Sequence, residues 1–325
     1  MKLLKIVPDN TNFRFLRWRN VAMAISALLV IGSIVLVATR GLNFGVDFAG
    51  GQMVRVTFKQ NPNLDQLRGD VAKVVEGDIS VQEFGSKRDI AIRAPAPEGD
   101  KAAADRAAQR LQAAIRTHYP DAVVSSVDTV SGKVSGELLT TGAWSLALAM
   151  VAISIYIWFR FEWQFGVGAL YALFHDVTLT FGFFALTQLE FNLNIVAALL
   201  TIIGYSLNDT IVVYDRIREN MKKFRKMPML ELLDLSTNET LSRTVMTSLT
   251  MLAALLALVL LGPEVIFGFA IAMFLGIFIG TYSSIYMAAP ILVWFKVGRE
   301  SFVAAASEGG EAKPVVEDKN RGAVV

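Results

Sequence analysis

The sequence contains no cysteine and two histidines, His118 and His175. Without cysteine there can be no disulfide bond and no thiolate metal site, and two histidines are too few for most metal clusters. We therefore expect no metal and no cofactor. The sequence also shows no nucleophile next to a base and no phosphate-binding loop, so we do not expect an enzyme.

Charged residues are scarce. They make up 18% of the 325 residues, whereas hydrophobic residues make up 54%, and the mean hydropathy is +0.47. Soluble proteins rarely have this composition, while multi-pass membrane proteins commonly do. The net charge of +2 gives no indication of a nucleic-acid partner, and membrane lipid is the expected surrounding.

Long apolar runs, by contrast, are abundant. A helix needs about 20 apolar residues to cross a bilayer. Segment 21–39 follows basic residues, as a signal peptide would, but its apolar run is long and no clear cleavage site follows, so we expect it to be retained. The last run is too long for a straight crossing, so it either tilts or continues as a cytoplasmic helix, with Pro290 as the candidate position of the change. The sequence predicts transmembrane helices at residues 21–39, 138–159, 165–187, 193–214, 243–261 and 265–295.

Lysine and arginine are distributed unevenly around these spans. They gather before the first span, between the second and third, and after the fourth and sixth, whereas the short connections QLEFN and GPEV have none. By the positive-inside rule, residues 1–20 and 296–325 are cytoplasmic, and residues 40–137 lie on the outer, periplasmic face. Segment 215–242 is then a cytoplasmic loop. Its MPMLELLDL stretch predicts either an amphipathic surface helix or the start of the fifth span, and the tail 296–325 is expected to be disordered.

Residues 40–137 contain a stretch of soluble character. QMVRVTFK alternates as a half-buried strand does, and NLDQLRGDVAKVV has one apolar helical stripe that begins near a capping residue, Asn63. Two short apolar runs around Gly85 predict a hairpin, DKAAADRAAQRLQAAIRTH a helix, and AVVSSVD a last strand. The order βαββαβ is that of an α+β ferredoxin-like domain. We expect this small domain to bind or dock rather than to catalyse.

Costly polar residues interrupt the apolar spans. A charged group at the bilayer centre costs roughly 2.5–3.5 kcal/mol on insertion scales, so such residues are commonly functional. A carboxylate that exchanges between an arginine partner and a proton can carry protons. We therefore predict a proton relay centred on Asp209, with the Ser/Thr-rich start of the fifth span lining its path. Its candidate members are His175, Asp176, Asn208, Asp209 and Arg243.

Simpler interpretations stay open for four of these residues. Asp209 can be an interfacial carboxylate paired with a surface lysine or arginine, and Arg243 a positive-inside anchor. His175 and Asp176 point about 100° apart on a helix, so they can be structural rather than part of a relay. Gly276 and Gly280 form a G-x-x-x-G pattern, which predicts close helix packing.

Three motifs resemble one family. GLNFGVDFAGG, with Gly45, Asp47, Phe48, Gly50 and Gly51, is similar to the GxDFxGG signature of the SecD/SecF family. GYSLNDTIVVYDRIREN and NETLSRTVMTSLT resemble the fourth-span and fifth-span signatures of its SecF branch. The likeness covers essentially residues 10–298, and the six-span layout with one outer domain also matches.

The resemblance implies a fold, a function and partners. It implies an RND-type half that pairs with SecD and assists the SecYEG channel, with YajC as a further associate, in moving preproteins across the bacterial inner membrane. The proton-motive force would drive it, with Asp209 as the proton-linked acid and Arg243 as the span-five arginine. Two alternatives remain, half of a proton-coupled exporter of small molecules or lipids and a non-conducting scaffold subunit. The small outer domain argues against the exporter, because a drug-sized pocket usually needs more wall.

Overall fold

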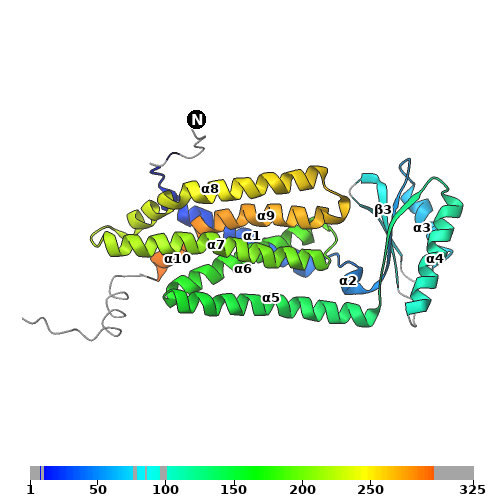
Figure 1. Cartoon of the computed structure of the whole chain (residues 1–325), viewed down its shortest axis with the longest axis horizontal. Helices are drawn as coiled ribbons and strands as arrows, with labels where there is room; N and C mark the ends of the chain where they lie inside the picture. Colours follow the sequence, from blue (N-terminus) through cyan, green and yellow to red (C-terminus); the bar gives the residue numbers. More distant parts are fainter. Residues whose placement is uncertain (1–7, 9–10, 76–78, 85, 96–100, 296–325) are drawn as a thin grey trace, which may run out of the picture.

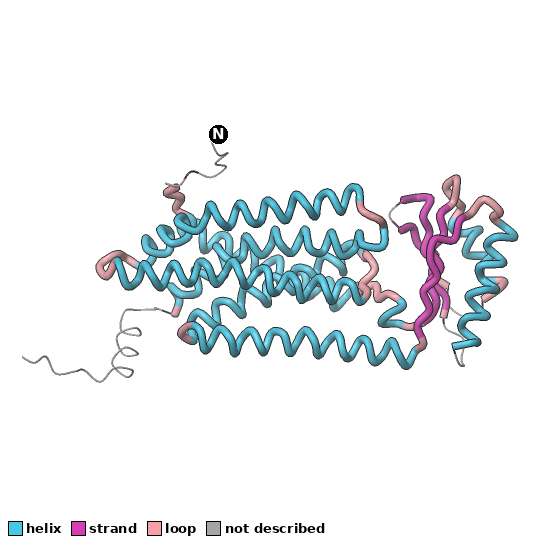
Figure 2. Tube along the Cα trace, in the orientation of Figure 1, coloured by secondary structure: helices cyan, strands magenta, loops and turns pink. Residues whose placement is uncertain are grey.

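The protein is a long helical bundle with a small α+β domain at one end, as the computed structural model shows (Figure 1). The structure describes residue 8 and residues 11–75, 79–84, 86–95 and 101–295. The predicted tail 296–325 and Gly85 of the predicted hairpin lie outside these ranges. The tube view in Figure 2 separates the two parts clearly, with nearly all strands in the end domain and long helices elsewhere.

Six helical segments of the described chain are long and apolar enough to cross a membrane. This confirms the predicted helical membrane fold. The first combines a 3-10 turn, η1 (Phe15–Trp18), with α1 (Arg19–Arg40), and the last combines α9 (Phe267–Ser283), a π-helical turn η3 (Ser284–Ala288) and α10 (Ala289–Trp294). The other four are α5 (Gly132–Arg160), α6 (Trp163–Thr187), α7 (Leu193–Lys223) and α8 (Met229–Leu261).

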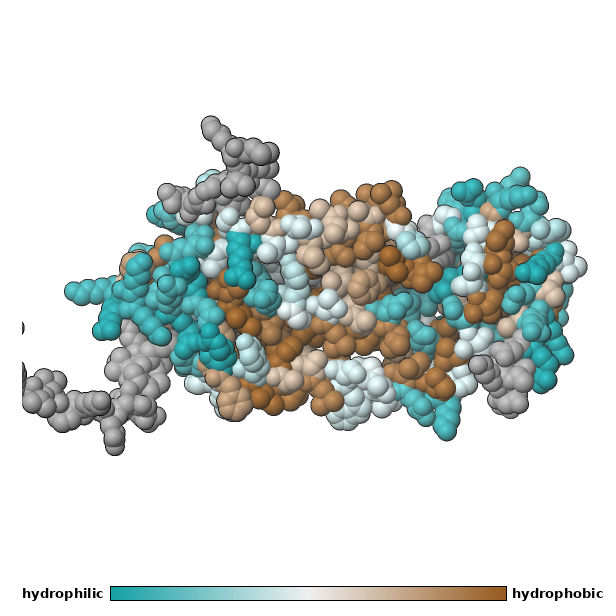
Figure 3. All heavy atoms as spheres, in the orientation of Figure 1, coloured by the Kyte–Doolittle hydropathy of each residue, from teal (hydrophilic) through white to brown (hydrophobic). Residues whose placement is uncertain are grey.

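Three of these segments form the centre of the bundle. In α6, α7 and the α9–α10 segment, 50% to 56% of the most apolar stretch is buried, compared with 6% to 17% in α1, α5 and α8. The outer helices therefore present apolar side chains, such as Trp158 and Phe159 at the end of α5, to the surroundings. Figure 3 shows hydrophobic residues gathered over the middle of the bundle, between hydrophilic regions at its two ends, as expected for a protein embedded in lipid.

Two helices extend well beyond their predicted spans. Helix α7 continues to Lys223, and α8 already begins at Met229, so the MPMLELLDL stretch is the start of the fifth helix rather than a separate surface helix. Leu232 and Leu233 of that stretch are buried, and the Asp234 carboxylate accepts a 2.9 Å hydrogen bond from the Leu16 backbone N–H. The start of α8 is thus covered by the segment that leads into α1.

The sixth segment changes its helical geometry just before Pro290. The π-helical turn η3 covers Ser284–Ala288, and Pro290 then lies in the first turn of α10. Proline has no backbone N–H to donate, and a π turn is one way to accommodate such a break within a helix. The π-helical turn therefore ends directly before the first turn of α10, which contains the proline at which the sequence predicts a change.

The end domain has the predicted βαββαβ order. After a short helix α2 (Val46–Ala49), it contains β1 (Gly51–Thr57), α3 (Leu64–Ala72), β2 (Ser80–Phe84), β3 (Ser86–Ala94), α4 (Lys101–His118) and β4 (Val123–Val130). The strand order is β2-β3-β1-β4, and every neighbouring pair is antiparallel, as in a ferredoxin-like sheet. Asn63 caps α3 by accepting from the N–H groups of Asp65 and Gln66. We call this part the sheet domain.

The two faces of the sheet have different neighbours. Helices α3 and α4 cover the face that points away from the bundle (Figure 1). Val54, Val56, Ile90 and Ile92 of the sheet form a core there with apolar residues of these helices, including Leu67. The other face lies toward the bundle, next to the connections between its helices.

Candidate functional site

Asp209 lies on α7, partly buried, and both of its carboxylate oxygens accept hydrogen bonds from other helices. The Thr244 hydroxyl of α8 donates to Oδ1 at 2.5 Å, and the Ser284 hydroxyl donates to Oδ2 at 2.7 Å. Ser284 is the first residue of the π-helical turn. Asp209 therefore lies where three membrane helices meet, and two rotatable hydroxyl groups hold it.

Arg243 and Asn208 lie at the edge of this site. Arg243 directly precedes Thr244, and it is close enough for its charge to act on the Asp209 carboxylate. The Arg243 side chain is nevertheless exposed on the surface of the bundle, and within the described ranges it makes no ion pair with Asp209. Asn208 is also exposed. The structure thus brings Arg243 near Asp209, and it leaves both Arg243 and Asn208 facing outward.

A second carboxylate, Asp176 on α6, is fully buried in the bundle. Its Oδ2 accepts hydrogen bonds from the Ser206 hydroxyl of α7 at 2.6 Å and from the Ser283 hydroxyl of α9 at 2.8 Å. Its Oδ1 lies 2.9 Å from Nδ1 of its neighbour His175. The two adjacent side chains therefore meet each other, although their helical positions point about 100° apart.

The His175 ring lies between this cluster and Tyr282, which contacts α1. Its ring centroid lies 6.2 Å from that of Tyr282, whose hydroxyl contacts the Ser26 hydroxyl of α1 at 3.0 Å. The Nε2 atom of His175 is buried and has no hydrogen-bond partner among the described residues. A buried polar atom without a partner is unusual in a folded protein.

The two carboxylate clusters are connected through α7 and the sixth segment. Ser206 and Asp209 are three residues apart on α7, so they lie on one face of that helix. Ser283 and Ser284 are adjacent, and each donates to a different carboxylate. The two clusters are therefore neighbours, and we call their polar side chains, which come from α6, α7, α8, α9 and η3, the polar track.

The track contains residues that the sequence analysis did not select. Ser206, Ser283 and Ser284 are small polar residues within strongly apolar runs, which is common in membrane helices. Two signals could have found them: the consecutive serines before Pro290, and the three-residue spacing between Ser206 and Asp209. Within the described ranges, no group of His, Asp and Glu side chains is large enough to hold a metal ion.

Gly276 and Gly280 lie on the face of α9 that meets α7. A Cβ atom at Gly276 would collide with the Ile202 side chain, and one at Gly280 would lie 3.1 Å from the Ser206 Cβ. Close approach of α7 and α9 at these glycines leaves Ser206, Ser283 and Ser284 within reach of the two carboxylates.

The glycine-rich signature connects the bundle to the sheet domain. The Gly45 N–H donates to the Phe191 carbonyl at 2.9 Å, and the Asp47 carboxylate accepts from the Leu193 N–H at the start of α7. Phe48 is buried, with its ring 6.0 Å from that of Phe191. Gly50 and Gly51 have φ angles of +70° and +110°, a region that favours glycine, and they lead directly into β1.

Comparisons with known proteins agree with this architecture. Residues 110–298 match the family described as "Protein export membrane protein SecD/SecF, C-terminal", and residues 35–62 match the "SecD/SecF GG Motif". The chain is 42% identical over 293 residues to the protein translocase subunit SecF of Rickettsia rickettsii, covering 90% of this chain and 94% of the relative. It is 44% identical over 308 residues to the same subunit of Rhodobacter capsulatus, covering 91% and 92%.

The fold is also similar to solved structures. The crystal structure of SecDF, a translocon-associated membrane protein from Thermus thermophilus, superposes with a TM-score of 0.80 at 36% identity. That match covers 89% of this chain and 39% of the SecDF chain, so this chain spans well under half the length of that protein. SecDF in its super-membrane-facing form superposes with a TM-score of 0.63. The chain belongs to the SecD/SecF family of protein export membrane proteins.

Proposed function

We propose that this chain works with SecD as the SecF subunit of the protein translocase, and that protons exchanging at Asp209 drive its part in export. The observation that carries the proposal is the hydroxyl cradle formed by Thr244 and Ser284 around the Asp209 carboxylate. If the carboxylate had only a structural role in a membrane helix, a fixed cation would stabilise its charge better than two rotatable hydroxyl groups do.

The cradle suits both protonation states of the carboxyl group. A serine or threonine hydroxyl can donate or accept. When Asp209 is ionised, both hydroxyls donate to it; when it is protonated, one of them can rotate and accept instead. Arg243, exposed beside the site, supplies a positive charge for the ionised state. A membrane potential of 100 mV provides about 2.3 kcal/mol for each charge that crosses, which is enough to shift a balance between two conformations.

His175 and Asp176 form the second part of the proposed relay. Asp176 and Asp209 each accept a hydrogen bond from one of the adjacent serines of the sixth segment, and His175 holds a buried ring nitrogen without a partner among the described residues. Asn208, exposed next to Asp209, would face the partner subunit. The alternative role for the His175–Asp176 pair is structural, as a hydrogen-bonded link between α6, α7 and α9.

Orientation in the membrane follows from the charges at the two ends of the bundle. The connections next to the sheet domain, residues 188–192 and 262–264, contain no lysine or arginine. Arg160, Arg218 and Lys222 lie at the opposite end of the bundle. By the positive-inside rule, we propose that both termini are cytoplasmic and that the sheet domain is periplasmic, in a bacterial inner membrane.

The proposed partners come from the relatives. The SecDF structure, of which this chain matches 39%, supports SecD as the partner that completes the assembly. The same protein is described as translocon-associated. We accordingly propose SecYEG, YajC and the preprotein in transit as further partners. Export of dyes by cells that carry this chain would instead favour the small-molecule exporter. If variants of the chain impair only the assembly of the complex, the scaffold is favoured.

Reporter secretion in cells that carry only the Asp209→Asn variant tests the proposal. We expect the variant to reach the membrane at normal levels, to co-purify with SecD, and to lose proton-driven stimulation of export. Asp215→Asn is the matched control, because Asp215 lies on the same helix, has a side chain that is 45% exposed, and pairs with Arg160 at 2.9 Å. Normal secretion by the assembled Asp209→Asn variant would rule out proton exchange at Asp209 and favour the scaffold.

A further inference from the structure

Glu190 lies at the junction between the bundle and the sheet domain, in the connection between α6 and α7. Its side chain is only 13% exposed. One carboxylate oxygen of Glu190 lies 3.8 Å from the Arg55 guanidinium of β1. The Asn192 side chain hydrogen-bonds to the Glu190 carboxylate. The carboxylate also rests against Gly45, where an added Cβ would collide with it. Glu190 is therefore enclosed by the sheet domain, the family signature and the start of α7.

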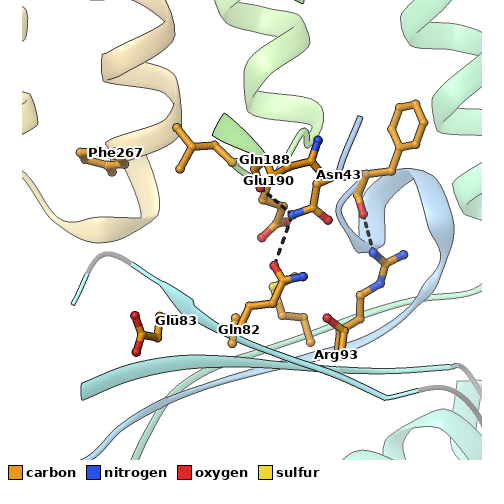
Figure 4. Close-up of a pocket in the computed structure, with 12 residues that line it drawn as sticks. Asn43, Gln82, Glu83, Arg93, Gln188, Glu190 and Phe267 are labelled. Atoms are coloured by element: carbon orange, nitrogen blue, oxygen red, sulfur yellow. Dashed lines mark hydrogen bonds between the residues drawn. The ribbon is translucent and has the colours of Figure 1, made fainter. Parts of the chain in front are cut away.

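A cavity of about 320 Å³ opens beside Glu190. Figure 4 shows it between the helix connections and the sheet, with Gln82, Glu83 and Arg93 on the sheet side. A hydrogen bond between the Asn43 and Gln82 side chains, and one from Arg93 to the Phe44 carbonyl, cross the junction. The cavity can bring water and protons to a carboxylate that the protein otherwise covers.

The surroundings of Glu190 act on its pKa in both directions. Burial raises the pKa of Glu190, and the charge of Asp47 raises it further, whereas Arg55, Arg93 and the Asn192 hydrogen bond oppose this rise. The net direction is upward, so the docked junction binds a proton more tightly than a solvated glutamate does.

Two other acidic groups face the same junction. Asp128 of β4 holds the Arg55 guanidinium at 2.7 Å, which is closer than Glu190 does, so the attraction of Arg55 is divided between two carboxylates. Glu83 of β2 lines the cavity but is exposed. Neither of these can replace Glu190, because neither is enclosed by both parts of the molecule.

We propose that Glu190 is a proton-binding site separate from the membrane relay, at which protonation holds the sheet domain against the bundle and deprotonation loosens it. The direction follows from linkage: whichever conformation binds the proton more tightly is favoured as the pH falls. When the pH lies below the raised pKa of Glu190, the docked conformation becomes more stable relative to the separated one. When the pH lies above it, the ionised carboxylate is solvated better if the sheet domain and the bundle separate.

Protonation or deprotonation of Glu190 can affect α7, because Glu190 lies just before the start of that helix. Asn192, two residues later, caps α7, and the Asp47 carboxylate accepts from the Leu193 N–H in the first turn of the same helix. Helix α7 also carries Asp209. Loosening of the junction would therefore free the end of the helix that holds the membrane carboxylate. The proposal does not depend on proton passage at Asp209.

Distance measurement across the junction tests the proposal. The chain has no cysteine, so two introduced cysteines carry spin labels without background. Lys87 of β3 and Val265, between α8 and α9, are both exposed. The full chain in lipid nanodiscs would be measured by double electron–electron resonance from about pH 4 to about pH 8, a range that starts near the ordinary glutamate pKa and extends well above it. We expect the long-distance population to grow as the pH rises.

Variants decide which carboxyl group is responsible. Glu190→Gln should remain in the short-distance population throughout, Glu190→Asp should keep a titration, and Glu83→Gln, on the same cavity, should behave like the wild type. Asp209→Asn should also keep the response, so failure of the relay and failure of this proposal are distinguishable. A Glu190→Gln chain that still titrates, a response that Glu83→Gln or Asp209→Asn abolishes, or a wild-type distance independent of pH would overturn the proposal.

Discussion

The Ser284 hydroxyl donates a 2.7 Å hydrogen bond to Asp209 from the first residue of a π-helical turn, while its neighbour Ser283 donates to Asp176. Adjacent residues of a helix point about 100° apart, so two consecutive serines can contact two different helices. Single π turns occur often at functional sites. The local geometry of the sixth segment thus connects both membrane carboxylates.

Removing the hydroxyl groups of the cradle should impair export. Hydrogen bonds to charged groups contribute about 1.5–3 kcal/mol each. We expect Thr244→Ala and Ser284→Ala each to lower the export rate severalfold, and the double variant to approach Asp209→Asn. Thr247→Ala is the matched control, because the exposed Thr247 hydroxyl bonds to backbone carbonyls of its own helix. Equal rates for Thr244→Ala and Thr247→Ala would show that the cradle has no role in export.

Gly276 should be intolerant of any side chain. A Cβ there would collide with Ile202 of α7, and overpacking of a close contact costs about 1–3 kcal/mol. We expect Gly276→Ala to lower the midpoint of thermal unfolding in detergent, and Ile202→Ala to restore part of the loss. Gly204→Ala is the control, since nothing lies within 4 Å of a Cβ at Gly204. Similar midpoints for the two glycine variants would contradict close packing at Gly276.

Much of the fold could be predicted because its signals are local. The six apolar runs and the alternating strand residues each report on their own segment, and Asn63 caps α3 as its sequence predicts. The ends of α7 and α8 could not be found this way, because their extensions are stabilised by tertiary contacts. Asp234, for example, accepts from the distant Leu16 backbone.

Some residues of the candidate site could likewise be predicted from the sequence, and others could not. Asp176 and Asp209 stand out because a carboxylate is costly in a membrane. Ser206, Ser283 and Ser284 do not, because a serine in an apolar run is ordinary and its partner lies on another helix. Glu190 also escaped selection, since a glutamate in a short connection is normally solvated, and its burial depends on a domain that is distant in sequence.

Asp70 should make the stability of the sheet domain depend on pH. Lys73, foremost through its hydrogen bond, lowers the pKa of Asp70 below 3.8, and the Tyr119 hydroxyl also donates to it. A lowered pKa contributes stability that is present above the unfolded value and is lost as the pH falls through the folded value. We expect Asp70→Asn to speed amide exchange in residues 64–75 at neutral pH.

The amide exchange rates of Asp70→Asn and the wild type should converge in strong acid, where the wild-type Asp70 carboxyl group is protonated and therefore uncharged as well. Comparison at the same pH removes the intrinsic pH dependence of exchange. Asp65→Asn is the control, because the Asp65 side chain is 90% exposed and its ion-pair partner among the described residues is Arg68 of the same helix. A difference between Asp70→Asn and the wild type that persists unchanged in acid would assign the effect to packing.

Asn208 and Arg243 should lie at the interface with SecD. Both are exposed polar residues in membrane helices, which is costly against lipid. With no native cysteine, Asn208→Cys and Arg243→Cys can be tested for crosslinks to single cysteines in co-expressed SecD. We expect crosslinks from both positions and none from Leu28→Cys, an apolar position on α1 that is 71% exposed. Crosslinks from Leu28 alone would place SecD against α1 instead.

Gly45→Ala should disturb the junction through Glu190. The backbone of Gly45 has a φ of −69°, which alanine adopts readily, so any effect must come from the collision of the new Cβ with the Glu190 carboxylate. We expect the substitution to displace Glu190, weaken the docking of the sheet domain, and lengthen the spin-label distance at every pH. Glu190→Ala in the same chain should relieve the collision and shorten the distance again. Gly69→Ala, in an open position on α3, should leave the distance unchanged and stabilise that helix by about 0.5–1 kcal/mol. If Gly45→Ala keeps the wild-type distance and its pH response, the signature glycine is not required for Glu190 to fit, and the contact between them does not hold the junction together.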